Sequence, residues 1–152
     1  MINDGLRIAL IAALPISELR GAIPIALTIY KMPAFSAYIF AVLGNIVPAV
    51  FLLLFLKPFS EYLRQWYYFD IFFEWLFKRT RRNTEEKFEK YGALFLLFFV
   101  AIPLPVTGAW TGSAAAFILG IRFWYAFPTI VGGVMIAGVI VTLASLGIIN
   151  FI

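Results

Sequence analysis

The sequence has no cysteine, no histidine and few charged residues outside one stretch of the chain. Without cysteine there is no disulfide or thiolate site, and without histidine the commonest proton shuttle and metal ligand is missing. A Ser–His hydrolase and an HExxH zinc enzyme are therefore excluded, and no aspartates cluster to hold Mg²⁺ for phosphoryl transfer. We expect no catalytic activity, no cofactor and no metal.

Charge is scarce because 63% of the residues are hydrophobic and only 13% are charged. Soluble domains have about 45–50% apolar and about 25% charged residues, so this composition predicts an integral membrane protein. Most of the charges, both basic and acidic, lie between residues 57 and 90. Since the basic residues have acids beside them, the net charge of +4 fits membrane orientation and does not indicate nucleic-acid binding.

Four apolar segments cover residues 6–30, 34–56, 92–119 and 123–149, each long enough for the ~20 residues of a spanning helix. The second and fourth carry no formal charge and are predicted to be transmembrane helices. The first and third are interrupted near the middle, which leaves apolar flanks of about ten residues that are too short to span. Each is predicted to be a re-entrant hairpin, and the alternative is a full helix kinked by proline. The predicted turn residues are Pro15, Gly21 and Pro24 in the first hairpin and Pro103, Pro105, Gly108 and Gly112 in the second.

The chain contains a weak internal repeat. Shifting it by 88 residues aligns Pro15 with Pro103 and Gly44 with Gly132, and the order of breakers, loop and glycine-bearing helix recurs. We therefore divide the single domain, residues 1–152, into repeat 1 (6–56), a connector (57–91) and repeat 2 (92–150).

The hairpins decide the topology. A hairpin plus one crossing helix makes an odd number of crossings, so the second repeat is inverted and both hairpin tips point at the midplane. Four full helices would instead make the repeats parallel. The predicted fold is thus an all-α membrane protein with two inverted repeats, each a re-entrant helical hairpin plus one transmembrane helix. The positive-inside rule places the basic connector in the cytoplasm and both termini outside.

The connector is predicted to be an amphipathic helical segment with a break near Tyr68, rich in aromatic residues and followed by the basic run KRTRR at residues 78–82. Such a surface suits the headgroup level of a membrane. It equally suits a helix packed under its own domain, because an amphipathic face does not reveal its partner.

The clearest candidate for a functional site is the pair Glu18 and Arg20 inside the first hairpin. A charge at the bilayer centre costs about 2.5–3.5 kcal/mol even on lenient scales, so such residues suggest a functional site. The alternative is a structural ion pair that closes the hairpin, and a direct pair needs a non-helical turn because residues i and i+2 do not face each other on a helix. The candidate substrate- or ion-binding residues are Ser17, Glu18, Arg20, Asn45, Thr107, Trp110 and Thr111.

The motifs PISELRGAIP, from Pro15, and PLPVTGAWTGSAAA, from Pro103, resemble the paired signature of the small multidrug export protein family of prokaryotic membrane proteins. That family is in turn similar to the DedA superfamily, which implies inverted repeats of a hairpin and a helix, and a prokaryotic cell membrane location. Val106 stands where the resemblance leads us to expect glycine, so the second turn is expected to be stiffer. Positions carried over from the resemblance are Pro15, Glu18, Arg20, Gly21, Pro24, Pro103, Pro105, Thr107, Gly108, Trp110, Thr111 and Gly112.

Three functions remain open. The first is a secondary transporter that exports a small molecule, with Glu18 as a proton or cation site and Arg20 as an anion site. The second is a flippase or scramblase for a phosphate-bearing lipid carrier or phospholipid, and the third is a non-transporting membrane scaffold. The expected partners are membrane lipids, a small-molecule or lipid substrate and further copies of the chain in a homodimer or larger assembly, because 152 residues leave little protein to cover two broken hairpins.

Overall fold

The computed structural model describes residues 2–63, 71–72, 74–75, 78, 86–104 and 107–151. These residues are helical with short turns, and no strand occurs among them. The predicted all-α class is confirmed. The helices are α1 (Ile2–Ala13), α2 (Glu18–Thr28), α3 (Ala34–Leu63), α5 (Glu86–Ala101), α6 (Ala109–Ile118) and α7 (Phe123–Phe151).

Two helices of the described residues are long and apolar enough to cross a membrane. They are the stretch Ala34–Phe59 of α3, with 26 residues, and the stretch Phe123–Ile149 of α7, with 27. At about 1.5 Å per residue each exceeds the ~30 Å hydrocarbon core of a bilayer. In an apolar 18-residue part of each stretch, only 33% is buried in the protein. Their length and exposed apolar surface fit a membrane environment, as the composition predicts.

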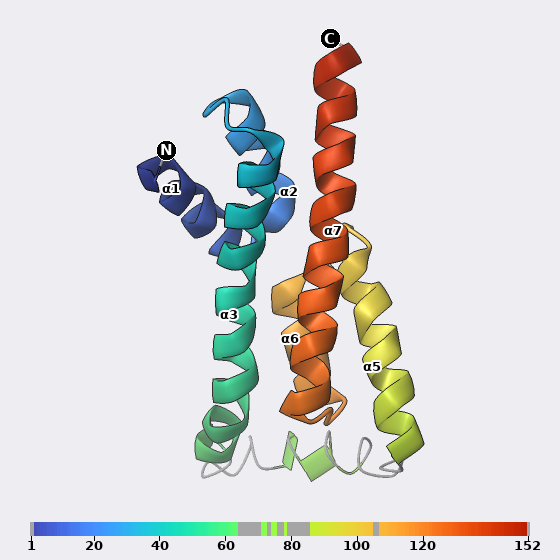
Figure 1. The fold of residues 1–152 in the computed structure, drawn as a ribbon. Coiled ribbons are helices and arrows are strands. Elements are labelled where there is room, and N and C mark those ends of the chain that lie inside the picture. The colour runs from blue at the N-terminus through green and yellow to red at the C-terminus, as the bar shows by residue number, and fades with distance from the viewer. Residues whose placement is uncertain are drawn as a thin grey trace.

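Figure 1 shows how the helices are arranged around these two. α3 runs from the upper to the lower end and α7 returns from the lower end to the upper. The pair α1–α2 lies beside the upper part of α3, and the pair α5–α6 lies beside the lower part of α7. Both termini are at the upper end. Near the start of α3, the hydroxyl of Tyr38 donates to the carbonyl of Met135 in α7 at 3.2 Å and ties the two long helices together.

The other four helices that the structure describes are short. α1 and α2 have 12 and 11 residues, and α5 and α6 have 16 and 10. Even the longest extends only about 24 Å at 1.5 Å per residue, so none of them crosses a bilayer alone. The non-helical residues between them, 14–17 in the first pair and 102–104 and 107–108 in the second, lie near the middle of the molecule. We call the first tip residues 13–20 and the second tip residues 102–104 and 107–110.

A close backbone contact holds α1 against α3. A Cβ added to Gly44 would lie 2.2 Å from the carbonyl oxygen of Ala9, so only glycine fits there. The residues 88 positions later in the chain also meet, because a Cβ on Gly132 of α7 would lie 3.1 Å from the side chain of Leu97 in α5. The two short pairs therefore pack on their long helices at equivalent positions.

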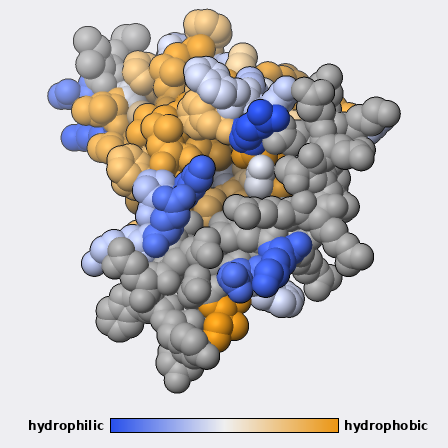
Figure 2. Space-filling view, turned by 90° about the horizontal axis from the view of Figure 1, so that it is seen from below, coloured by the Kyte–Doolittle hydropathy of each residue, from blue (hydrophilic) through white to orange (hydrophobic). Residues whose placement is uncertain are grey.

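The predicted connector lies largely outside the described residues. α3 continues to Leu63, beyond the predicted segment end at residue 56, and α5 begins at Glu86. Phe72 and Trp75 are exposed and their rings pack with centroids 6.5 Å apart. Figure 2 views this lower end, where separate hydrophilic patches stand among hydrophobic side chains.

Candidate functional site

Glu18 is the first residue of α2 and adopts a left-handed backbone conformation, with φ of 43°. Its N–H donates to the carbonyl of Leu14 at 3.0 Å, so the turn is closed by a backbone bond. A left-handed conformation costs a non-glycine residue roughly 1–2 kcal/mol. The side chain of Glu18 is only 6% exposed, although it carries a carboxylate.

The carboxylate of Glu18 lies against the start of α6. A Cβ added to Gly108, the N-cap residue, would lie 1.8 Å from Oε2 of Glu18. The backbone N–H of Trp110 donates to Oε1 at 3.5 Å. Because free N–H groups give a helix N-terminus partial positive charge, α6 stabilises the buried carboxylate. Gly108 is thus the residue that makes room for the acid of the opposite tip.

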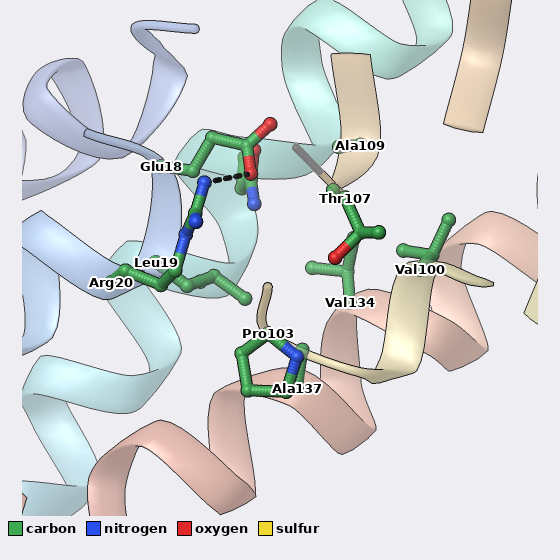
Figure 3. Close-up of a pocket in the computed structure, with 11 residues that line it drawn as sticks. Glu18, Leu19, Arg20, Val100, Pro103, Thr107, Ala109, Val134 and Ala137 are labelled. Atoms are coloured by element: carbon green, nitrogen blue, oxygen red, sulfur yellow. Dashed lines mark ion pairs between the residues drawn. The ribbon is translucent and has the colours of Figure 1, made fainter. Parts of the chain in front are cut away.

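Arg20 extends toward the same carboxylate, as Figure 3 shows. Its Nη2 is 3.8 Å from Oε2 of Glu18, while its Nη1 donates to the carbonyl of Leu104 in the second tip at 2.5 Å. The left-handed conformation at Glu18 explains how residues two apart in sequence can meet, which a regular helix would prevent. The guanidinium side chain is 27% exposed, so it lies at the edge of the site and not inside it.

Trp110 provides a third contact between the tips. Its indole N–H donates to the carbonyl of Ala13, the last residue of α1, at 3.0 Å. Thr107, by contrast, bonds within its own loop, donating to the carbonyl of Ile102 and accepting from the N–H of Leu104. The two tips are therefore joined through Glu18, Arg20 and Trp110, each of which contacts the backbone of the opposite tip.

A small cavity lies where the tips meet α3 and α7, with about 10 Å³ of space for the centre of a water-sized molecule. Among the predicted binding residues, Glu18, Arg20, Asn45 and Thr107 line it. Its other walls are mostly apolar (Figure 3): Leu19, Val100, Pro103, Gly108, Ala109, Val134 and Ala137.

The remaining predicted binding residues lie beside the cavity without lining it. Ser17 is in the first turn and makes no capping bond to α2. The hydroxyl of Thr111 donates to the carbonyl of Gly108 at 3.4 Å. Trp110 holds the tips together from the start of α6. The roles of these three residues in binding stay predictions.

Asn45 lies in α3 and is 1% exposed. Its Oδ1 is buried and has no hydrogen-bond partner among the described residues. Buried polar atoms normally have a partner, so this unpaired acceptor at a cavity wall is unusual.

Three predicted turn residues lie inside helices instead. Gly21 and Pro24 are in α2, and Gly112 is in α6. The turn of the first hairpin lies earlier, at residues 14–17, and α2 contains Pro24 although this residue has no N–H to donate to the carbonyl of Arg20. Membrane helices tolerate such a proline. Pro15 and Pro103 do lie in the non-helical turns. Pro105 and Val106 lie outside the described residues, so the predicted stiffness of that turn stays a prediction.

Sequence reasoning did not find several groups of the site. The carbonyls of Ala13 and Leu104 accept the indole and guanidinium donors, and no residue type indicates a backbone acceptor. Val134 and Ala137 place α7 at the cavity wall, yet both are ordinary apolar residues of a membrane helix. The sequence predicts Gly108 as a turn residue, but only the fold reveals that the carboxylate of Glu18 packs against it.

A protein-family model described as "Putative small multi-drug export protein" matches residues 18–140 of the chain. The match includes both long apolar helices over most of their length and every predicted binding residue except Ser17. Searches among curated proteins and among solved structures found no match.

Proposed function

Because the chain belongs to the small multi-drug export protein family, we propose that it is a membrane transporter that exports a small molecule through a site between two hairpin tips. The observation that carries this proposal is the burial of the Glu18 carboxylate beside Arg20 where the two tips meet. The tips lie about halfway along α3 and α7 (Figure 1). Placing a charged side chain near the middle of a bilayer costs free energy, so the presence of Glu18 and Arg20 there suggests a function. We propose transport and no catalysis, since histidine and cysteine are absent from the sequence.

We further propose that α1–α2 and α5–α6 are re-entrant hairpins that enter from opposite faces of the membrane, as two inverted repeats. Three observations support this. The four helices are too short to span, the long helices run in opposite directions, and corresponding helices end 88 residues apart: α1 at Ala13 and α5 at Ala101. The tips then lie near the midplane, where transporters of this architecture bind their substrates.

In this arrangement the contacts between the tips form a closed state. A substrate larger than a water molecule exceeds the cavity, so the tips must separate toward one face before it enters. Separation breaks the bonds of Arg20 to Leu104 and of Trp110 to Ala13. We propose that a proton or cation at Glu18, or an anionic group at Arg20, replaces these contacts and thereby couples binding to opening.

Transport in proteoliposomes tests the site. Ethidium efflux driven by a pH gradient should be strongly reduced in Glu18→Gln and in Arg20→Gln. A matched control is the ion pair of Asp4 and Arg7 in α1, 3.9 Å apart, with side chains 36% and 63% exposed. Asp4→Asn and Arg7→Gln make the same chemical changes away from the tips and should leave efflux unchanged. Wild-type efflux in the double variant Glu18→Gln/Arg20→Gln would refute the site.

A lipid substrate is the second candidate, favoured by the partly exposed guanidinium of Arg20 close to the N-terminus of α6. Such donors suit a phosphate headgroup. Dithionite quenching of fluorescent phosphatidic acid in the same proteoliposomes measures translocation, and Arg20→Gln should abolish it. If folded protein moves neither ethidium nor this lipid, the charges serve to join the tips and the scaffold function is correct.

We propose that a second copy of the chain covers the tips. Ile16 in the first tip is 92% exposed, and Ile102 and Leu104 of the second tip are also exposed. Non-helical backbone at membrane depth must be buried in protein or face water. Because the chain has no cysteine, Ile16→Cys gives a single reactive thiol in membranes. A crosslinked dimer is expected there, and Arg7→Cys at the exposed end is the control that should stay monomeric.

A further inference from the structure

The unpaired Oδ1 of Asn45 is the starting point. Asn45 is 1% exposed, and this oxygen finds no donor among the described residues. A buried acceptor without a partner loses its hydration and gains nothing in return. Such a group usually has a bound ligand or serves a function.

The carboxylate of Glu18 lines the same cavity and lacks a close partner as well. Its contacts among the described residues are 3.5 Å to the N–H of Trp110 and 3.8 Å to Nη2 of Arg20. Charge-assisted bonds to carboxylates are usually about 2.7–2.9 Å long. Two residues from different helices, Asn45 of α3 and Glu18 of α2, therefore line one cavity, and each has an oxygen acceptor with unused hydrogen-bonding capacity.

The space limits what can bind between them. Its roughly 10 Å³ for the centre of a water-sized molecule is close to the minimum of about 10–15 Å³ that holds one water. The hydroxyl of Thr107 is already used within its loop, so it adds no strong donor to the cavity. A ligand must accordingly be small and must present hydrogen or positive charge to both oxygens.

We propose that Oδ1 of Asn45 and the carboxylate of Glu18 together bind one water-sized electropositive ligand, either a water molecule or a sodium ion. The ligand links α3 to the first tip and completes the coordination of both oxygens. This inference rests on the proposed function only in placing the ligand within the transport site; the binding itself follows from the two acceptors and the cavity.

The sign of one stability change tests the proposal. Leucine branches at the same side-chain carbon as asparagine and has no acceptor, although it is the larger residue. If a ligand bridges the two oxygens, Asn45→Leu removes it, and the thermal unfolding midpoint of the detergent-solubilised protein should fall by about 2–4 °C. If Oδ1 has no ligand, leucine removes an unsatisfied acceptor and the midpoint should rise. A rise would overturn the proposal. Ser113→Ala, which removes a buried hydroxyl that does not line the cavity, is the control for general loss of a polar group.

A second pair of variants avoids dependence on how leucine packs. Asn45→Ser and Asn45→Ala differ by one hydroxyl, and a bridging ligand should make the serine variant the more stable of the two. If the unfolding midpoint of Asn45→Ala is equal to or higher than that of Asn45→Ser, no ligand bridges the two oxygens.

The same measurement in sodium chloride and in choline chloride identifies the ligand. A sodium-dependent rise of the wild-type midpoint that Asn45→Leu abolishes indicates the ion. If Asn45→Leu lowers the unfolding midpoint equally in both salts, the ligand is water. Because the assay measures stability without flux, its outcome is separate from that of the transport experiments.

Discussion

Replacing Gly108 by alanine is expected to destabilise the protein through the Glu18 carboxylate. A Cβ at this position would lie 1.8 Å from Oε2 and 2.5 Å from Cδ of Glu18, so the carboxylate must leave its place at the N-terminus of α6. Inserting an atom into a packed site costs about 1–3 kcal/mol. The contact of Glu18 with the N–H of Trp110 is long, at 3.5 Å, so its loss adds little. We therefore expect the free energy of unfolding to fall by about 1–3 kcal/mol, with a parallel loss of transport.

The assay is a double-mutant cycle with Glu18→Ala, measured by denaturant unfolding in detergent. In the Glu18→Ala background the obstructing carboxylate is gone, so Gly108→Ala should cost much less than it does alone. Gly147→Ala in α7 is the matched control, because a Cβ there meets nothing within 4 Å. It should stabilise the helix by about 0.5–1 kcal/mol. If Gly108→Ala lowers the free energy of unfolding equally in both backgrounds, the packing of the Glu18 carboxylate against Gly108 is refuted.

Three further predictions address other contacts. Trp110→Phe removes the indole donor to the end of α1 and should lower the free energy of unfolding by about 1 kcal/mol, measured by denaturant titration. Gly44→Ala should destabilise more than Gly132→Ala, because the nearest neighbour is a fixed backbone carbonyl in the first case and a movable side chain in the second; comparing the two unfolding midpoints checks this. A single cysteine at Lys57 should react with a membrane-impermeant maleimide only in inverted vesicles, and one at Arg7 only in intact cells; the reverse pattern would contradict the proposed orientation.

Much of the architecture follows from the distribution of breakers and charges along the sequence. The apolar lengths predicted the two long helices α3 and α7, and the interrupted segments predicted where the short helices end. The convergence of Glu18 with Thr107 on one cavity was also predictable, because both belong to motifs at matching positions of the two halves. Their functional roles stay predictions.

The details of the tips could not be read from residue types. The sequence predicts Pro24 in a turn, yet it lies inside α2, and membrane helices tolerate an internal proline. The left-handed conformation of Glu18 and the acceptors at Ala13 and Leu104 depend on how two distant segments meet. No residue type or short motif in the sequence predicts such backbone properties.

The separation of the two tips along the chain has a consequence for biosynthesis. Glu18 precedes its hydrogen-bond donor Trp110 by 92 residues. At about 5–20 residues per second, a ribosome needs roughly 5–18 s to add them. Throughout this interval the nascent first half carries a carboxylate and a guanidinium whose partners in α6 and its preceding loop do not yet exist. Water or an insertion factor must shelter these charges until the second half arrives, so the speed of translation bears directly on the yield of folded protein.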